Sequence, residues 1–308
     1  MERPSDNPHG RAEAIAQALG NAIAYVSNEL VVLTQYEAYQ EDKFPELWDD
    51  AAAGAFDARM NSVEEHLGGP PEAYLVATGA SAPLSDSYPR AALREALDVF
   101  RLARKSVLRS HMFMTGALML QEDPTLITLS SDPAVGALFV KGAEKAFWEH
   151  AEAAYIRLYS FWDRVGQILD FAYFNIRKFD QNGFHAVVER VAANVAPMNP
   201  QLKDSGAWKR VRAFQSSEKD DGLKWLLLRR NLIIHSLHLH PLRENDDAML
   251  RSQFNHLDSA HREKLRPRQM PQEVKQLMVH LNRAATLFND CLVIVRLSPS
   301  RKVDRFVR

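Results

Sequence analysis

The chain has 308 residues, 46% of them hydrophobic and 25% charged, which is typical of a globular protein with one large domain or two modest ones. Its formal net charge is −1, so a nucleic-acid binder would need local basic clusters. The single cysteine, Cys291, excludes an intrachain disulfide and a cysteine-built zinc site. Residues 1–10 lack the apolar core of a signal peptide and no long apolar run occurs, so we expect a cytoplasmic protein without a membrane span.

The first part of the chain is predicted to be a helical extension. Apolar residues recur at helical spacing from Arg11 to about Tyr39 and predict an amphipathic helix. A second, short helix is predicted over residues 55–67. The stretch that follows, to residue 89, is rich in Ala, Ser, Gly and Pro and is typical of a loop. We therefore expect an N-terminal helical segment and loop over residues 1–89.

The rest of the chain is predicted to be an all-α bundle over residues 90–298 with a basic tail over 299–308, without strands or repeats. The predicted helices are Pro89–Leu120, Pro133–Lys178, Phe184–Asn194, Ser205–Phe214, Lys224–His240 and one from Pro271, with a loop over 242–270. The second of these would be on the order of 65–70 Å long. We therefore expect a break in it, with Gly142 as one candidate, and a left-handed stop at Asn182–Gly183.

The stretch Lys224–His240 combines two properties that conflict. Its aliphatic residues point in almost every direction around a helix, which predicts a helix buried on all sides. Among the aliphatic residues lie Arg229, Arg230, Asn231, His235, His238 and His240. Such groups cost several kcal/mol in a buried helix unless they are paired or line a cleft.

Helix geometry brings some of these polar residues together. Asn231 and His235 are four residues apart and share a face, and His238 joins them three residues later. Arg230 points about 140° away from His235 on a regular helix. Both side chains could contact the same phosphate group of a ligand in three ways. The long arginine side chain could reach around the helix, the helix could break locally, or a second copy of the chain could supply one of the two residues across a twofold axis.

Common catalytic motifs are missing from the sequence. It contains no phosphate-binding glycine loop, no dinucleotide fingerprint, no HisGluXaaXaaHis helix and no GlyXaaSerXaaGly elbow. After these exclusions, the remaining candidates for catalytic residues are Arg, His and Asn side chains on helices. Arginine–histidine pairs at similar spacing recur at Arg59–His66, Arg104–His111 and Arg251–His256, so the apolar context sets Arg230–His235 apart.

A second motif precedes this one. Tyr159, Asp163, Gly166, Asp170 and Tyr173 form one stripe of a helix, and Leu158–Asp170 includes the sequence TyrSerPheTrpAspArgVal. Together with the ArgAsnXaaXaaXaaHis pattern that follows in the chain, it resembles the signatures of bacterial families in the HEPN superfamily. That resemblance implies a helical bundle of the HEPN type that dimerises and cuts RNA without a metal or a cofactor.

The resemblance also implies roles for individual residues. Arg230 would neutralise the scissile phosphate, His235 would act as general acid or base, and Asn231 would orient His235 or the phosphate. The ribose 2′-hydroxyl would be the nucleophile. Asp163, Tyr159 and His238 are the candidate substrate-binding residues. The expected partners are an RNA substrate, a second copy of the chain and an antitoxin or regulatory protein, as for a toxin or defence effector.

Two other interpretations remain open. In the first, a noncatalytic helical module binds a partner protein or a nucleotide through the same cleft. In the second, the polar residues only hold the bundle together, with Arg230 paired to an internal carboxylate and His235 fully buried. The basic clusters are solvated surface or phosphate contacts. They are Lys209–Arg212, Arg262–Arg268 and Arg301–Arg308.

Overall fold

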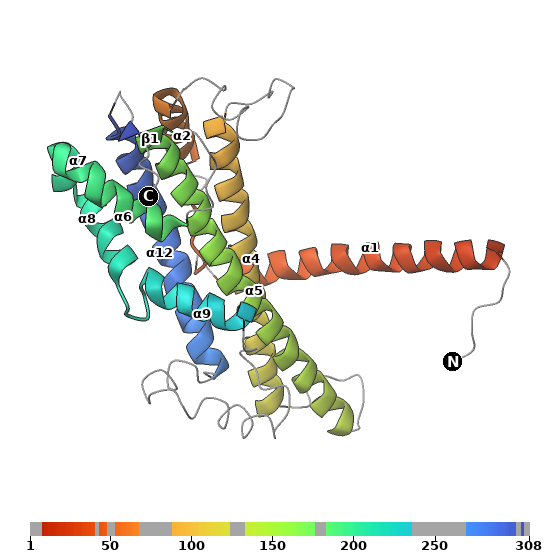
Figure 1. Cartoon of the computed structure of the whole chain (residues 1–308). Helices are drawn as coiled ribbons and strands as arrows, with labels where there is room; N and C mark the ends of the chain where they lie inside the picture. The colour runs from red at the N-terminus through yellow and green to blue at the C-terminus, as the bar shows by residue number, and fades with distance from the viewer. Residues whose placement is uncertain are drawn as a thin grey trace. The chain divides into compact units, whose positions relative to one another are not determined.

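The computed structural model describes residues 8–40, 43–47, 53–67, 88–123, 133–175, 183–235, 269–299 and 303–304. These ranges are helical almost throughout, which confirms the prediction of an all-α fold (Figure 1). Their one β pairing, which the sequence did not predict, is parallel and joins β1 (Phe174–Asn175) to β2 (Val303–Asp304). No helix in these ranges is long and apolar enough to cross a membrane.

The chain divides into two compact units, residues 1–44 and 45–308. The first unit contains α1 (Pro8–Ala38) and the second contains the other helices. The helix α2 (Ala53–Leu67) belongs to the second unit because it packs on α12 (Met270–Arg296). Arg59 Nη1 donates to Asn289 Oδ1 at 2.9 Å, and His66 Nε2 lies 2.8 Å from Ser298 Oγ.

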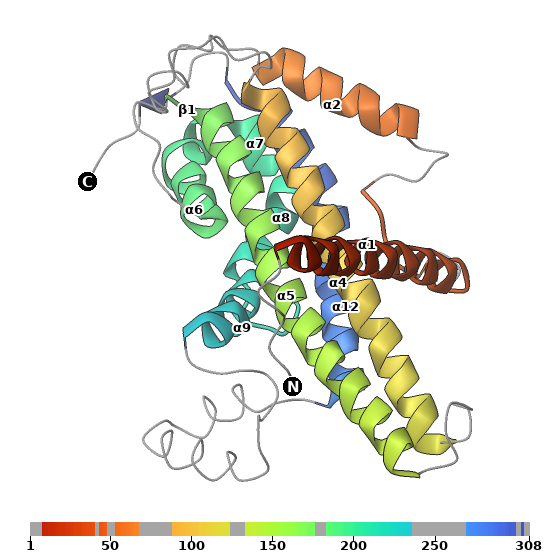
Figure 2. The ribbon, with the colours of Figure 1, turned by 90° about the vertical axis from the view of Figure 1, so that its right-hand side faces the viewer.

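The longest helices form an antiparallel hairpin. α4 (Tyr88–Glu122) and α5 (Pro133–Tyr173) lie side by side (Figures 1 and 2). The predicted break at Gly142 is wrong, because α5 is continuous over 41 residues. Gly142 is exposed and has nothing within 4 Å of the position that a Cβ would take. One exposed glycine costs a helix only about 1 kcal/mol, which packing against α4 outweighs.

The start of α6 (Phe184–Asn194) is pressed closely onto α5. A Cβ on Gly166 of α5 would lie 2.8 Å from Phe184 Cα, and a Cβ on Gly183 would lie 2.8 Å from Asp163 Oδ1. Gly183 itself is extended, with φ −64° and ψ 166°, and precedes α6. The predicted left-handed stop at this residue is therefore wrong, and the glycine is needed for close approach.

Three short helices follow α6 and lead to α9 (Leu223–His235). They are the 3₁₀ helix η2 (Ala196–Met198), α7 (Pro200–Asp204) and α8 (Gly206–Ser216). The side chain of Asn199 accepts from Leu202 N at 3.0 Å, and that of Ser205 accepts from Trp208 N at 3.2 Å, so α7 and α8 each have a polar N-cap.

The core lies where α12 packs against α5, α8 and α4. Most aromatic side chains in the later half of α5 are buried there, with Tyr159 half-buried. Trp162 lies with its ring centroid 4.9 Å from that of Phe184 and 4.7 Å from that of Phe214, while Phe161 lies 5.7 Å from Phe288. Four elements of the second unit therefore share one aromatic cluster.

Gly166 and Gly142 provide a matched pair of substitutions in α5. Gly166→Ala should lower the free energy of unfolding by roughly 1–3 kcal/mol, because the new methyl group meets the backbone of α6. Gly142→Ala should raise it by about 0.5–1 kcal/mol, because the helix loses a glycine in open space. Urea unfolding followed by circular dichroism measures both changes. Equal effects of the two substitutions would contradict this account of the α5–α6 contact.

Candidate functional site

The helix α9 is buried at its start and partly exposed towards its end. Leu223, Trp225 and Leu226 are buried, whereas Ile234 is 43% exposed. The residues between them that are only half-buried are Leu227, Leu228, Arg230, Asn231, Leu232 and Ile233. The prediction of a helix buried on all sides is therefore wrong for its later half, and its polar residues there reach solvent.

Arg229 is the exception, because it lies in the core. It is 2% exposed and forms a salt bridge with Glu273 of α12, which is fully buried. Tyr155 of α5 donates its hydroxyl to Glu273 Oε2 at 2.6 Å. The guanidinium carbon of Arg229 lies 5.9 Å from the ring centroids of both Tyr155 and Trp225. Arg229 is thus a structural residue that ties α9 to α12 and α5.

Arg230, the next residue, has different surroundings. Its Nη1 donates to Asn231 Oδ1 at 2.9 Å, and its guanidinium carbon lies 5.5 Å from the centroid of the Tyr159 ring on α5. Arg230 forms no salt bridge with any residue that the structure describes. Within the described part of the chain, the buried carboxylate therefore pairs with Arg229 rather than with Arg230.

Asp163 lies one helical turn after Tyr159 on α5, at the start of α6. Burial raises the pKa of Asp163, while the backbone N–H of Phe184 and the charges of Arg230 and Arg164 oppose that shift. Within the described part of the chain, Asp163 Oδ1 has no hydrogen-bond partner. Burial and the neighbouring Asp163 raise the pKa of Tyr159 to about 12, so its hydroxyl stays protonated at neutral pH.

Four of the six predicted site residues therefore meet at one place. They are Tyr159 and Asp163 from α5 and Arg230 and Asn231 from α9. His235 is the last residue of α9, four residues after Asn231, and its side chain lies outside the description. His238 also lies outside the described residues, as do His240, the cluster Arg262–Arg268 and the basic residues of Arg301–Arg308.

The one basic cluster that the structure describes, Lys209–Arg212, is largely committed to carboxylates. Arg210 forms two hydrogen bonds with Asp290, at 2.8 Å and 2.6 Å, and Arg212 Nη1 lies 2.9 Å from Glu189 Oε1. Such pairs leave less positive charge for phosphate groups. Arg230 therefore differs from both arginines of this cluster.

The sequence did not identify Glu273 as the partner of Arg229. The available signal was its place on the apolar face of α12, four residues before Leu277, where a carboxylate needs a buried cation. In the described parts of the chain, no three His, Cys, Asp or Glu side chains lie close enough together to hold a metal ion.

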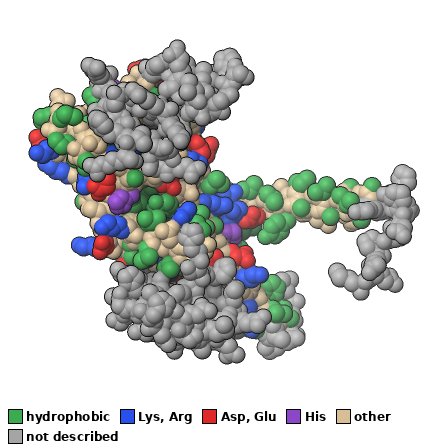
Figure 3. Space-filling view, in the orientation of Figure 1, with side chains coloured by type: hydrophobic (Ala, Val, Ile, Leu, Met, Phe, Trp, Pro, Cys, Tyr) green, Lys and Arg blue, Asp and Glu red, His purple; other side chains and the backbone are tan. Residues whose placement is uncertain are grey.

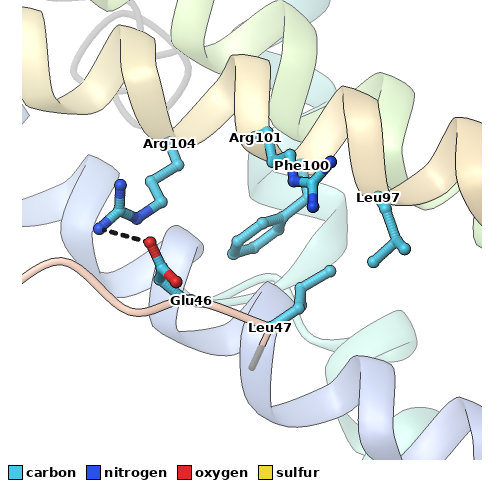
Figure 4. A pocket seen from close by; sticks show the side chains of 6 residues that line it. All are labelled: Glu46, Leu47, Leu97, Phe100, Arg101 and Arg104. Carbon is cyan, nitrogen blue, oxygen red and sulfur yellow. Dashed lines mark ion pairs between the residues drawn. The ribbon is translucent and has the colours of Figure 1, made fainter. Parts of the chain in front are cut away.

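A small pocket lies away from these residues, between α4 and the segment that precedes α2 (Figure 4). Its volume is about 80 Å³, and Arg104 Nη2 pairs with Glu46 Oε1 across it at 3.2 Å. Its other lining residues are Leu47, Leu97, Phe100 and Arg101. Pockets for drug-sized ligands measure roughly 300–1,000 Å³, so this one fits only a few water molecules or a small ion.

Comparison of the chain with protein-family models, with curated proteins and with solved structures found no match.

The adjacent arginines of α9 should respond differently to the same substitution. Arg229→Met leaves Glu273 buried without its cation and should lower the free energy of unfolding by roughly 3–5 kcal/mol. Arg230→Met breaks no salt bridge in the described residues and should change it by less than about 1 kcal/mol. Chemical denaturation of both variants tests this difference. Similar losses would show that both arginines are structural.

His280 of α12 is a second buried residue in contact with Trp225 of α9. It is 1% exposed, and its ring stacks on Trp225 with a centroid distance of 5.3 Å. Burial lowers the pKa of His280 to about 4, Arg283 adds to that shift, and the backbone of Asp220 and the charges of Asp220 and Asp221 oppose it. Neither ring nitrogen has a hydrogen-bond partner among the described residues.

The low pKa of His280 predicts a loss of stability in acid. Between pH 6.5 and about pH 4, His280 is protonated in the unfolded chain but neutral in the folded protein. The free energy of unfolding therefore decreases as the pH falls through this window. The loss attributable to His280 should be on the order of 3 kcal/mol. His280→Gln should remove that part of the pH dependence, measured by urea unfolding at several pH values, whereas His185→Gln on α6 should keep it. An unchanged slope in His280→Gln would contradict the assignment.

Proposed function

We propose that the chain is a HEPN-type, metal-independent endoribonuclease that acts as a homodimer, as a toxin or defence effector would. One observation carries the proposal: of two adjacent arginines, Arg229 is neutralised in the core, while Arg230 is held at the partly exposed end of α9 beside Asn231. A cation supported by a neutral amide and a phenol ring is suited to an anionic ligand.

The proposed reaction is transfer within the RNA backbone. His235 removes the proton of the ribose 2′-hydroxyl, whose oxygen then bonds to phosphorus as the bond to the 5′-oxygen breaks. A proton returns to that leaving oxygen, which gives a 2′,3′-cyclic phosphate and a 5′-hydroxyl end. Arg230 neutralises the charge on the phosphate, and Asn231 orients the phosphate or His235. The ordinary pKa of histidine, near 6.5, suits such proton transfers.

Tyr159 and Asp163 support this arrangement from α5. The Tyr159 hydroxyl remains a hydrogen-bond donor because its pKa is raised to about 12. Asp163 places a carboxylate near Arg230 and near the start of α6, where it can limit how the guanidinium turns. His238 would extend the site beyond α9. A twofold contact through the later half of α9 would bring Arg230 of one copy near His235 of the other.

A noncatalytic function of the same surface is the second candidate. The observation that favours it is the row of half-buried aliphatic residues around Arg230, with Ile234 43% exposed. Apolar side chains that ring a charged group are typical of protein interfaces. In that case a partner protein or a nucleotide binds at Arg230 without RNA turnover.

Cleavage of single-stranded RNA in the presence of EDTA tests the proposal. The wild-type protein should cut RNA and leave DNA of the same sequence intact. His235→Ala and Arg230→Met should each lower the cleavage rate by at least about 100-fold.

Matched control variants outside the site are His150→Ala on α5 and Arg283→Met on α12, which should keep the wild-type rate. Circular dichroism establishes that each variant is folded. Unchanged cleavage by a folded His235→Ala variant would refute the catalytic role of His235. Absence of turnover, together with a partner that binds wild type but not Arg230→Met, would establish the noncatalytic function.

A further inference from the structure

The helix α1 exposes apolar side chains along its length (Figure 3). Leu19 is 60% exposed, Ile23 67%, Val26 52% and Leu30 45%. Every side chain from residue 12 to residue 28 is exposed. This is the largest row of exposed apolar residues among the helices that the structure describes.

The spacing of these residues identifies what could cover them. Ala12, Ala16, Leu19, Ile23, Val26, Leu30 and Leu33 alternate in steps of four and three residues. This is the heptad pattern of a helix that pairs with another helix in a coiled coil. Leu33 is already buried, so the free part runs from Ala12 to Leu30 and is called the α1 seam below.

An uncovered α1 would be a poor helix. Gly20, Asn21 and Asn28 lie in its interior, and isolated helices are marginal in water even when they are rich in alanine. Helices of this kind are stabilised by burying an apolar face. We therefore expect another helix to cover the α1 seam and so stabilise α1.

The charges of α1 narrow the choice of partner. The helix contains Glu13, Glu29 and Glu37, and its one basic residue of the lysine or arginine type is Arg11 in its first turn. A helix of this composition is poorly suited to bind RNA or an anionic membrane, because helices that bind such polyanions carry several basic residues. None of the three glutamates lies on the α1 seam itself, and Glu13 and Glu29 flank it at positions that can remain in contact with solvent.

We propose that α1 pairs with α1 of a second copy of the chain in a two-stranded coiled coil along the α1 seam. The pairing is isologous: the same residues serve both partners. It is a different contact from the one through α9 that the proposed ribonuclease uses, and it does not depend on that activity.

The test compares two valines of the same helix in the full-length chain. Val26 is on the α1 seam and 52% exposed, whereas Val32 is off it and 50% exposed. Val26→Asp should weaken self-association at least about 30-fold, because each copy would bury a carboxylate against the other. Val32→Asp, with the same chemical change, should alter it less than about threefold. Sedimentation equilibrium over a range of concentrations measures both.

A third variant, Ile234→Asp, separates this contact from the one through α9. Self-association that Val26→Asp weakens and Val32→Asp preserves supports the proposal, whatever Ile234→Asp does. A monomeric wild type overturns it, as does self-association that is insensitive to Val26→Asp. Loss of self-association in Ile234→Asp alone would overturn the α1 pairing while leaving the α9 contact of the proposed function intact.

Discussion

The buried salt bridge between Arg229 and Glu273 fixes how α9 lies in the second unit. Two charges this deep are tolerated only when each satisfies the other, and the Tyr155 hydroxyl completes the carboxylate's hydrogen bonding. Because Tyr155 belongs to α5 and Glu273 to α12, three helices meet at one guanidinium. Successive residues of a helix point about 100° apart. Once Arg229 points into the core, Arg230 has to point towards the edge of the bundle.

That edge is shaped by two glycines on either side of the α5–α6 contact. Gly166 lets the backbone of α6 reach α5, and Gly183 leaves room for the carboxylate of Asp163. Asp163 is thereby held at the start of α6, where backbone N–H groups favour a negative charge. A carboxylate in this place can serve the fold by capping α6 and can also set the electrostatic field at Arg230. The candidate site is thus built on contacts that the fold already needs.

The sequence predicted the long helices because their apolar residues repeat over many turns. It also drew attention to the polar residues that lie within the apolar stretch Lys224–His240. The shared location of Tyr159 and Asp163 followed from helical spacing. It did not predict which of two arginines would be buried, since the deciding residue, Glu273, lies 44 positions further along the chain. The break expected at Gly142 failed because a local preference of about 1 kcal/mol is weaker than tertiary packing. The contact of α2 with α12 joins residues more than 200 positions apart, so it too could not be predicted from local patterns.

The partial exposure of α9 bears on how one copy could bring its polar groups together. On a regular helix Arg230 and His235 point about 140° apart, so a phosphate bound by Arg230 of one copy does not lie on the face of its own His235. Ile234, which precedes His235 in the chain, leaves an exposed apolar side chain at this end of α9. A twofold contact there would cover that surface and supply the missing histidine from the other chain. Burial of apolar area and completion of the site would then be a single event, which would make activity depend on protein concentration.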